Sequence, residues 1–250
     1  MRILVVNPNT SEEMTRDIAE QAARYARPDT ELETVAASWG PRSIEGHYEE
    51  HVAAVATLEA IGSRAGSFDA VVIACFGDPG LYAAREVSPV PVIGIAEAAL
   101  LTACTVAYRF SVVTVLPRVR PLIEETVRRV GLESRCASVR TTPLSVLDCE
   151  RDPDAAAREI AVAARAAVEE DLAEAICLGC AGMGPLDRRV GDELGIPVLD
   201  GVACAIKLAE GIVDYGLQTS RVAAFRAPEP KEYVAYDAAA AAAAGGIDGA

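Results

Sequence analysis

Two cysteines of this sequence, Cys75 and Cys180, have neighbours that suit them to chemistry. Each comes at the end of an apolar run expected to be a buried strand, and each is followed within two residues by glycine, which lets backbone N–H groups turn toward a ligand. In open α/β sheets, ligands bind beyond the carboxyl ends of the strands. Two thiols on opposite sides of one carbon can remove a proton from one face and deliver a proton to the other. The pair therefore predicts inversion of a carbon stereocentre without a cofactor.

The cysteines also have plainer interpretations. A single cysteine at a strand end is more often packed in a core than reactive. Cys177 and Cys180 form a C-x-x-C motif, as redox dithiols do, but Cys177 is expected inside an apolar strand rather than at a helix N-terminus. Seven cysteines in 250 residues do not indicate a disulfide framework, so free thiols are expected, with core filler as the default for Cys104, Cys136, Cys149 and Cys204.

The elements that must position these thiols follow from the alternation of short apolar runs with helical patterns, which predicts an α/β fold with parallel sheets. Strands are expected at 3–6, 71–74, 92–95, 112–115, 175–178 and 197–199. Thr10 and Glu13 have the spacing of a capping box, which predicts a helix after the first strand. Asp152 and Pro153 predict the start of a helix that runs to about residue 171.

The sequence also repeats itself at an offset of 105 to 107 residues, which predicts two similar α/β lobes. Three pairs of segments carry the repeat: 2–6 with 109–113, the strand ending in Cys75 with the strand ending in Cys180, and 91–92 with 197–198. If the lobes face each other across a pseudo-twofold axis, both sulfurs lie in one cleft between them. Equivalent positions in a repeat favour the catalytic interpretation of the two cysteines.

Composition excludes several other functions. With 51% hydrophobic residues the chain can build a core, and its net charge of −14 is unfavourable for binding nucleic acid or an anionic membrane. No apolar run reaches the roughly 20 residues of a membrane span, and the first residues do not resemble a signal peptide. No phosphate-binding loop or G-x-G-x-x-G motif follows the first strand, so no nucleotide cofactor is indicated. A cytoplasmic protein is expected.

Six motifs in order resemble the hydantoin racemase family of the aspartate/glutamate racemase superfamily. They are Asn7-Pro-Asn-Thr, Gly40-Pro-Arg-Ser-Ile-Glu, Cys75-Phe-Gly-Asp-Pro-Gly-Leu, Ile93-Gly-Ile-Ala-Glu-Ala, Leu178-Gly-Cys-Ala-Gly-Met and Asp200-Gly-Val. The resemblance extends from residue 1 to about 233 and is specific as a set. It implies that Cys75 and Cys180 are the family's two catalytic cysteines.

Further expectations come from this resemblance. It implies two flavodoxin-like lobes with the active site between them, and a C-terminal segment that returns to the first lobe. We therefore predict a first lobe at 1–106 plus 207–233, a second lobe at 107–206, and an Ala/Gly-rich tail at 234–250. It further implies racemisation of 5-monosubstituted hydantoins, or of allantoin as in close relatives. No metal or organic cofactor and a homo-oligomeric assembly are expected.

Substrate contacts can be predicted from the same chemistry. Removal of the hydantoin C5 proton gives an enolate, which backbone N–H groups stabilise; the segments beside the two sulfurs, Phe76 with Gly77 and Ala181 with Gly182, would supply them. One cysteine must then be a thiolate and the other a thiol. The apolar residues that directly follow the cysteines favour a neutral ring over a zwitterion, although they could simply pack the wall.

Three polar residues could contact a cyclic ureide. They are Asn9, which could instead stabilise its own turn, Ser43, which could belong to a plain turn, and Thr114. We interpret Asp78 and Asp200 as braces of loops or helices. His47 and His51 lie four residues apart, but a zinc site needs a third ligand, and an exposed helix is the expected setting.

Overall fold

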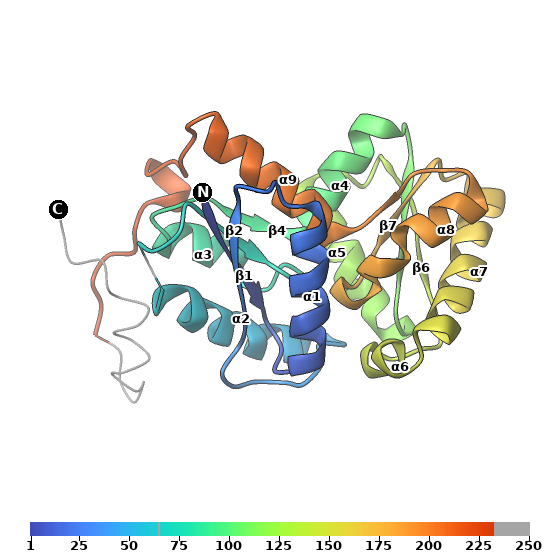
Figure 1. Cartoon of the computed structure of the whole chain (residues 1–250), viewed down its shortest axis with the longest axis horizontal. Coiled ribbons are helices and arrows are strands. Elements are labelled where there is room, and N and C mark those ends of the chain that lie inside the picture. Colours follow the sequence, from blue (N-terminus) through green and yellow to red (C-terminus); the bar gives the residue numbers. More distant parts are fainter. Residues whose placement is uncertain (65, 233–250) are drawn as a thin grey trace.

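The structure is a computed structural model that describes residues 1–64 and 66–232. Two lobes lie side by side, and each is built around a four-stranded parallel sheet (Figure 1). The strand orders, β2-β1-β3-β4 and β6-β5-β7-β8, are equivalent. This confirms the predicted α/β fold of two pseudo-symmetric lobes.

The first sheet is buried on both faces at its centre. Its strands are β1 (Arg2–Asn7), β2 (Glu31–Ala36), β3 (Ala70–Ile73) and β4 (Val92–Gly94). Alternate residues of β1 point to opposite faces, so Ile3 and Val5 belong to one hydrophobic cluster and Leu4 and Val6 to another. Its helices are α1 (Glu12–Tyr25), α2 (His47–Gly62), α3 (Leu81–Val87) and α4 (Ile95–Val106).

The second lobe repeats this plan. Its strands are β5 (Phe110–Thr114), β6 (Cys136–Thr141), β7 (Ala175–Leu178) and β8 (Val198–Leu199). Its helices are α5 (Arg120–Val130), α6 (Val146–Arg151), α7 (Pro153–Asp171) and α8 (Asp187–Leu194), with 3₁₀ turns at η1 (Pro117–Val119) and η2 (Ala181–Leu186). One hydrophobic cluster contains buried residues of both lobes, so the lobes share a core.

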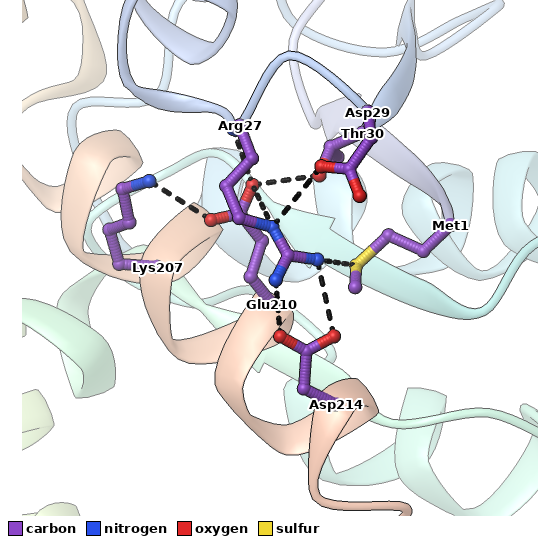
Figure 2. Close-up of polar contacts among 7 residues, drawn as sticks. All are labelled: Met1, Arg27, Asp29, Thr30, Lys207, Glu210 and Asp214. Carbon is purple, nitrogen blue, oxygen red and sulfur yellow. Dashed lines mark hydrogen bonds and ion pairs between the residues drawn. The ribbon is translucent and has the colours of Figure 1, made fainter.

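The last long helix, α9 (Gly201–Asp214), leaves the second lobe and packs on the first, against α1, α4 and β3 (Figure 1). Figure 2 shows its polar anchor, Glu210, whose side chain is only 4% exposed. The Glu210 carboxylate accepts hydrogen bonds from the Arg27 backbone N–H at 2.7 Å, Thr30 Oγ1 at 2.8 Å and Lys207 Nζ at 3.0 Å. Three donors thus offset the cost of burying a carboxylate, which fixes α9 to the first lobe. A short turn, η3 (Ala223–Phe225), follows.

Local signals in the sequence were mostly reliable. Asp152 caps α7 as predicted, since its side chain accepts from the Ala155 N–H at 2.9 Å. The prediction that Thr10 caps α1 was wrong by one residue, because Ser11 Oγ accepts the Met14 N–H. The predicted lobe boundaries stay a prediction, and the tail at 234–250 lies outside the described residues. No helix within the described ranges is long and apolar enough to cross a membrane.

Candidate active site

A small cavity lies between the lobes, where the carboxyl ends of β1 and β3 face those of β5 and β7. Its volume is about 40 Å³, room for a few water molecules rather than the several hundred Å³ of a typical ligand pocket. Cys75 and Cys180 both line it, one from each lobe. The first lobe also contributes Asn9, Met14, Ile44, Ala74, Phe76 and Gly77, and the second Thr114, Val115, Val119, Leu122, Ile123, Val146, Gly179 and Ala181. In this arrangement the lobes are closed around the two thiols.

The loop after Cys75 is held in one conformation by Asp78. The Asp78 backbone N–H donates to the Cys75 carbonyl at 2.9 Å, and its carboxylate accepts the N–H groups of Ala96 and Glu97 at 3.0 and 2.9 Å, at the start of α4. Asp78 has φ +50°, a left-handed conformation that a non-glycine residue adopts at some cost. The turn directs the Gly77 N–H at the Cys75 sulfur, where it favours the thiolate.

The loop after Cys180 is also held by a carboxylate, but here the carboxylate belongs to the helix and not to the loop. The Gly182 N–H faces the Cys180 sulfur. Here the carboxylate comes from the helix: Asp200 caps α9 by accepting the Ala203 N–H at 2.6 Å, and a Cβ on Gly184 of the cysteine loop would lie 2.7 Å from Asp200 Oδ2. In the first lobe the Asp78 carboxylate likewise lies against Gly94, where a Cβ would clash with its Oδ1. In both lobes a buried carboxylate therefore fills the space beside a glycine, between the cysteine loop and the next helix.

Burial dominates the acidity of both thiols. It raises the pKa of Cys75 to about 12 and that of Cys180 to about 11, although the glycine N–H groups oppose the shift. Nearby carboxylates add to the rise, Asp78 and Glu50 at Cys75 and Glu150 with Glu45 at Cys180. In this arrangement desolvation outweighs the local donors, although both cysteines are only partly buried, and the thiolate expected from the sequence stays a prediction.

Asn9 presents a hydrogen-bond donor to the cavity. Its Oδ1 accepts from Asn7 Nδ2 and from the Ser11 N–H, each at 2.9 Å, so the oxygen stabilises the turn after β1. Its Nδ2 contacts Met14 Sδ at 3.1 Å, and a thioether is a weak acceptor. The two interpretations of Asn9 thus apply to different atoms: the oxygen fixes the turn, and the amide nitrogen can donate to a ligand.

A family model described as Asp/Glu/Hydantoin racemase matches residues 3–209 of the chain. The chain belongs to this family. It is 49% identical over 236 residues to a protein named hydantoin racemase from Pseudomonas sp. (strain NS671), and the match covers 94% of each. An allantoin racemase from Klebsiella pneumoniae has a TM-score of 0.92 at 42% identity, covering 96% of this chain and 98% of that one. Another from Pseudomonas fluorescens has a TM-score of 0.91 at 44% identity, covering 94% of this chain and 100% of that one.

Membership of the racemase family confirms the resemblance seen in the motifs and makes the chain an isomerase. The lobes have the flavodoxin-like fold of this family. Phe76, Gly77 and Ala181 line the cavity as the motifs suggested. Thr114 lines it too, and its hydroxyl donates to the Gly179 carbonyl at 3.0 Å, which leaves its oxygen free to accept from a ring N–H.

Ser43 lies beside the cavity rather than on its wall. The residue of its loop that lines the cavity is Ile44, and a role for Ser43 stays a prediction. Sequence reasoning missed most of the apolar wall. This wall consists of Met14 of α1, Val119 of η1, Leu122 and Ile123 of α5, Val146 of α6, and Ile44 of the loop before α2. Their signal in the sequence is the ordinary apolar periodicity of core helices.

Polar contacts between the lobes hold this racemase closed on both sides of the cavity. Near Cys180, Glu45 Oε1 accepts the Val146 N–H at 2.9 Å, and Ser11 Oγ donates to Glu150 Oε1 at 3.0 Å. Near Cys75, Arg129 Nη2 donates to the Gly77 carbonyl at 2.7 Å. These three hydrogen bonds join the two lobes beside the cavity.

The remaining candidates lie away from the cavity. Cys177 is fully buried in β7 with its sulfur 3.8 Å from the Ala99 carbonyl, so it does not face Cys180 as a redox partner would. His47 and His51 occupy an exposed turn at the start of α2. Within residues 1–64 and 66–232, no three His, Cys, Asp or Glu side chains are grouped to hold a metal ion.

Proposed function

We propose that this enzyme racemises 5-monosubstituted hydantoins by moving the C5 proton between Cys75 and Cys180, with no cofactor. The observation that supports this most directly is the pair of thiols in one inter-lobe cavity. The N–H of the glycine two residues after each cysteine, Gly77 or Gly182, faces its sulfur. Equivalent acids on opposite walls suit a reaction whose two directions are chemically equivalent.

The proposed reaction conserves every atom and electron. One cysteine, as thiolate, takes the C5 proton: the C–H bond breaks, an S–H bond forms, and the electron pair moves into the ring as an enolate centred on the C4 oxygen. The other cysteine, as thiol, then protonates C5 from the opposite face and becomes the thiolate. Asn9 Nδ2 is positioned among the cavity walls as a donor for the enolate oxygen.

Thiolate formation is proposed to occur in the open cleft. In the closed arrangement burial raises both thiol pKa values well above neutrality. Water that reaches the sulfurs when the lobes part removes much of this desolvation cost. A thiolate formed there and then enclosed with its substrate would be a strong base for the C5 proton.

The chemistry of the wall supports an apolar C5 substituent. Met14, Ile44, Val119, Leu122 and Val146 supply hydrocarbon surface. A protein named hydantoin racemase is 49% identical to this chain, which agrees with that choice. Allantoin is the second candidate, because two solved structures with TM-scores above 0.9 are named allantoin racemases. Its polar ureido group would find few partners on this wall.

The test follows optical rotation of L-5-benzylhydantoin and (S)-allantoin in parallel, with a chelator present, and repeats the better reaction in deuterated water. We expect loss of rotation with benzylhydantoin, and uptake of one deuterium at C5 without other change. Rapid loss with allantoin alone would assign the second candidate. A Cys180→Ser variant that racemised normally would refute the two-thiol mechanism.

Two further properties are proposed on general grounds. All seven cysteines are free thiols in the structure, which agrees with a reducing compartment such as the cytoplasm. Assembly into a homo-oligomer, implied by the resemblance to the family, stays a prediction that sedimentation analysis can check.

A further inference from the structure

Arg129 belongs to the second lobe but contacts the loop that carries Cys75 in the first. It lies in the last turn of α5, and its Nη2 donates to the Gly77 carbonyl at 2.7 Å. Its guanidinium also lies 5.9 Å from the centroid of the Tyr82 ring, at the start of α3. Gly77 is the residue whose N–H faces the Cys75 sulfur. Arg129 therefore holds the residue that sets the environment of this thiol.

The charges around Cys75 give Arg129 a second role. Two carboxylates face the thiol, Glu50 from α2 and Asp78 from its own loop, and Cys180 faces it from the other lobe. Each carboxylate disfavours a thiolate, and Arg129 acts as a counter-charge to both. Without this cation the two carboxylates, wherever they are ionised, make the charge near Cys75 more negative, and the thiolate loses stability.

Among the described residues, no cation donates a hydrogen bond to the loop after Cys180. The contacts that cross the cleft near Cys180 come from two carboxylates, Glu45 and Glu150, and the groups that raise its pKa are the same two. Arg42 of the first lobe is a counter-charge to Glu150, but it does not hold the Cys180 loop by a hydrogen bond, as Arg129 holds the Cys75 loop. The pseudo-symmetry of the fold does not extend to the charges at its interface.

We propose that Arg129 is a positioning residue for Cys75, which fixes the Gly77 turn and balances the nearby carboxylates whenever the lobes close. It acts through Gly77 and makes no contact with the cavity itself. The inference assigns to Cys75 a dependence on a cation of the opposite lobe that holds its loop by a hydrogen bond. It rests on the proposed function only in giving Cys75 a catalytic task.

The experiment compares Arg129→Met and Arg129→Lys with Arg128→Met. Arg128 is the matched control, because it precedes Arg129 on α5 and lines the same groove between α2 and α5, of about 540 Å³. Iodoacetamide labelling between pH 7 and 10, followed by peptide mass spectrometry, gives a rate for each cysteine, and below the thiol pKa this rate is proportional to the thiolate fraction. The ratio of the Cys75 rate to the Cys180 rate in the same protein cancels any change of access that both thiols share. The kcat and KM of racemisation are measured on the same proteins.

In Arg129→Met we expect the Cys75 labelling rate to fall roughly threefold relative to the Cys180 rate, the shift that follows when the pKa of Cys75 rises by about half a unit and that of Cys180 does not change. Arg129→Lys should recover part of the shift, because an ammonium can donate to the Gly77 carbonyl. kcat should fall more than KM rises. Arg128→Met should resemble the wild type.

Three results would overturn the proposal. Unchanged labelling rates would show that Arg129 does not act on Cys75. Equal increases in the labelling rates of both thiols would show that Arg129 merely latches the lobes, since opening exposes both sulfurs to water. An equal effect of Arg128→Met would reduce the role to bulk charge. If instead the wild type racemises neither substrate, the proposed function fails while the labelling still tests the role of Arg129.

Discussion

Replacing Asn9 by aspartate should stop catalysis while preserving the fold. The carboxylate keeps an oxygen to accept the two 2.9 Å hydrogen bonds from Asn7 and from the Ser11 N–H, so the turn after β1 retains both. What is lost is the amide donor, whose present contact is the weakly accepting Met14 sulfur. The substitution therefore separates the structural atom of this side chain from the one proposed to act on substrate.

The size of the effect follows from the task assigned to the donor. A preorganised hydrogen bond to a developing oxyanion contributes about 3 kcal/mol, so its loss should lower kcat by 10²- to 10³-fold. The new negative charge beside the enolate adds to this, so the expected loss is at least about 10²-fold. The thermal midpoint should change by only a few degrees, because no structural hydrogen bond is removed.

The assay is the initial rate of racemisation, followed by circular dichroism, alongside thermal unfolding of the same protein. Met14→Leu is the matched control: it removes the other partner of the contact but keeps the apolar wall, and it should retain activity within about threefold. An Asn9→Asp enzyme within tenfold of the wild type would refute the role of Asn9 as the oxyanion donor. A large loss of stability would show that the turn, not the donor, explains the effect.

Three other perturbations test the structure. Because burial raises both thiol pKa values, kcat/KM should climb nearly tenfold per unit from about pH 6 to 8, and a flat profile would contradict this. Burial opposes ionisation of Glu210, but its hydrogen bonds lower its pKa overall. The ionised carboxylate therefore stabilises the fold above the ordinary glutamate pKa, and this stabilisation is lost as the pH falls through the lowered pKa of the folded state. Glu210→Gln should thus cost about 1–3 kcal/mol at pH 7 and little near pH 3 in urea unfolding, unlike Asp214→Asn, whose side chain is 49% exposed. Gly179→Ala places a Cβ 2.7 Å from Thr114 Cβ, so denaturation should show a loss of about 1–3 kcal/mol.

The central strands could be predicted from the sequence because burial on both faces gives them continuous apolar runs. Of the four edge strands, β4 and β8 were also predicted, but β2 and β6 could not be, since they are half-exposed and carry polar residues such as Glu31, Glu33 and Arg140. Thr10 and Ser11 are both good capping residues, and only the backbone decides between them. Here Thr10 is engaged elsewhere, with its backbone N–H donating to the Pro41 carbonyl at 3.1 Å.

The candidate site divides in the same way. The cysteines and their glycines are visible because sequence neighbours create the motif, and the repeat marks them twice. The wall and the closing contacts join residues far apart in the chain: Arg129 meets Gly77 across 52 positions, and Glu45 meets Val146 across 101. A charged side chain at the end of a helix carries no local sign of such a partner. The burial that raises the thiol pKa values likewise exists only when both lobes are in place.

The route of α9 determines the order in which the molecule can be completed during synthesis. The first lobe leaves the ribosome early, yet the face that α9 covers must wait until residues 201–214 have emerged, after the whole second lobe. Val202, Ile206 and Ala209 are fully buried there, so until then the nascent lobe exposes apolar surface and lacks Glu210 as a partner for Arg27 and Thr30. The lobe made first is therefore finished last, and no cut of the gene between the two sheets can yield it as an independent fragment.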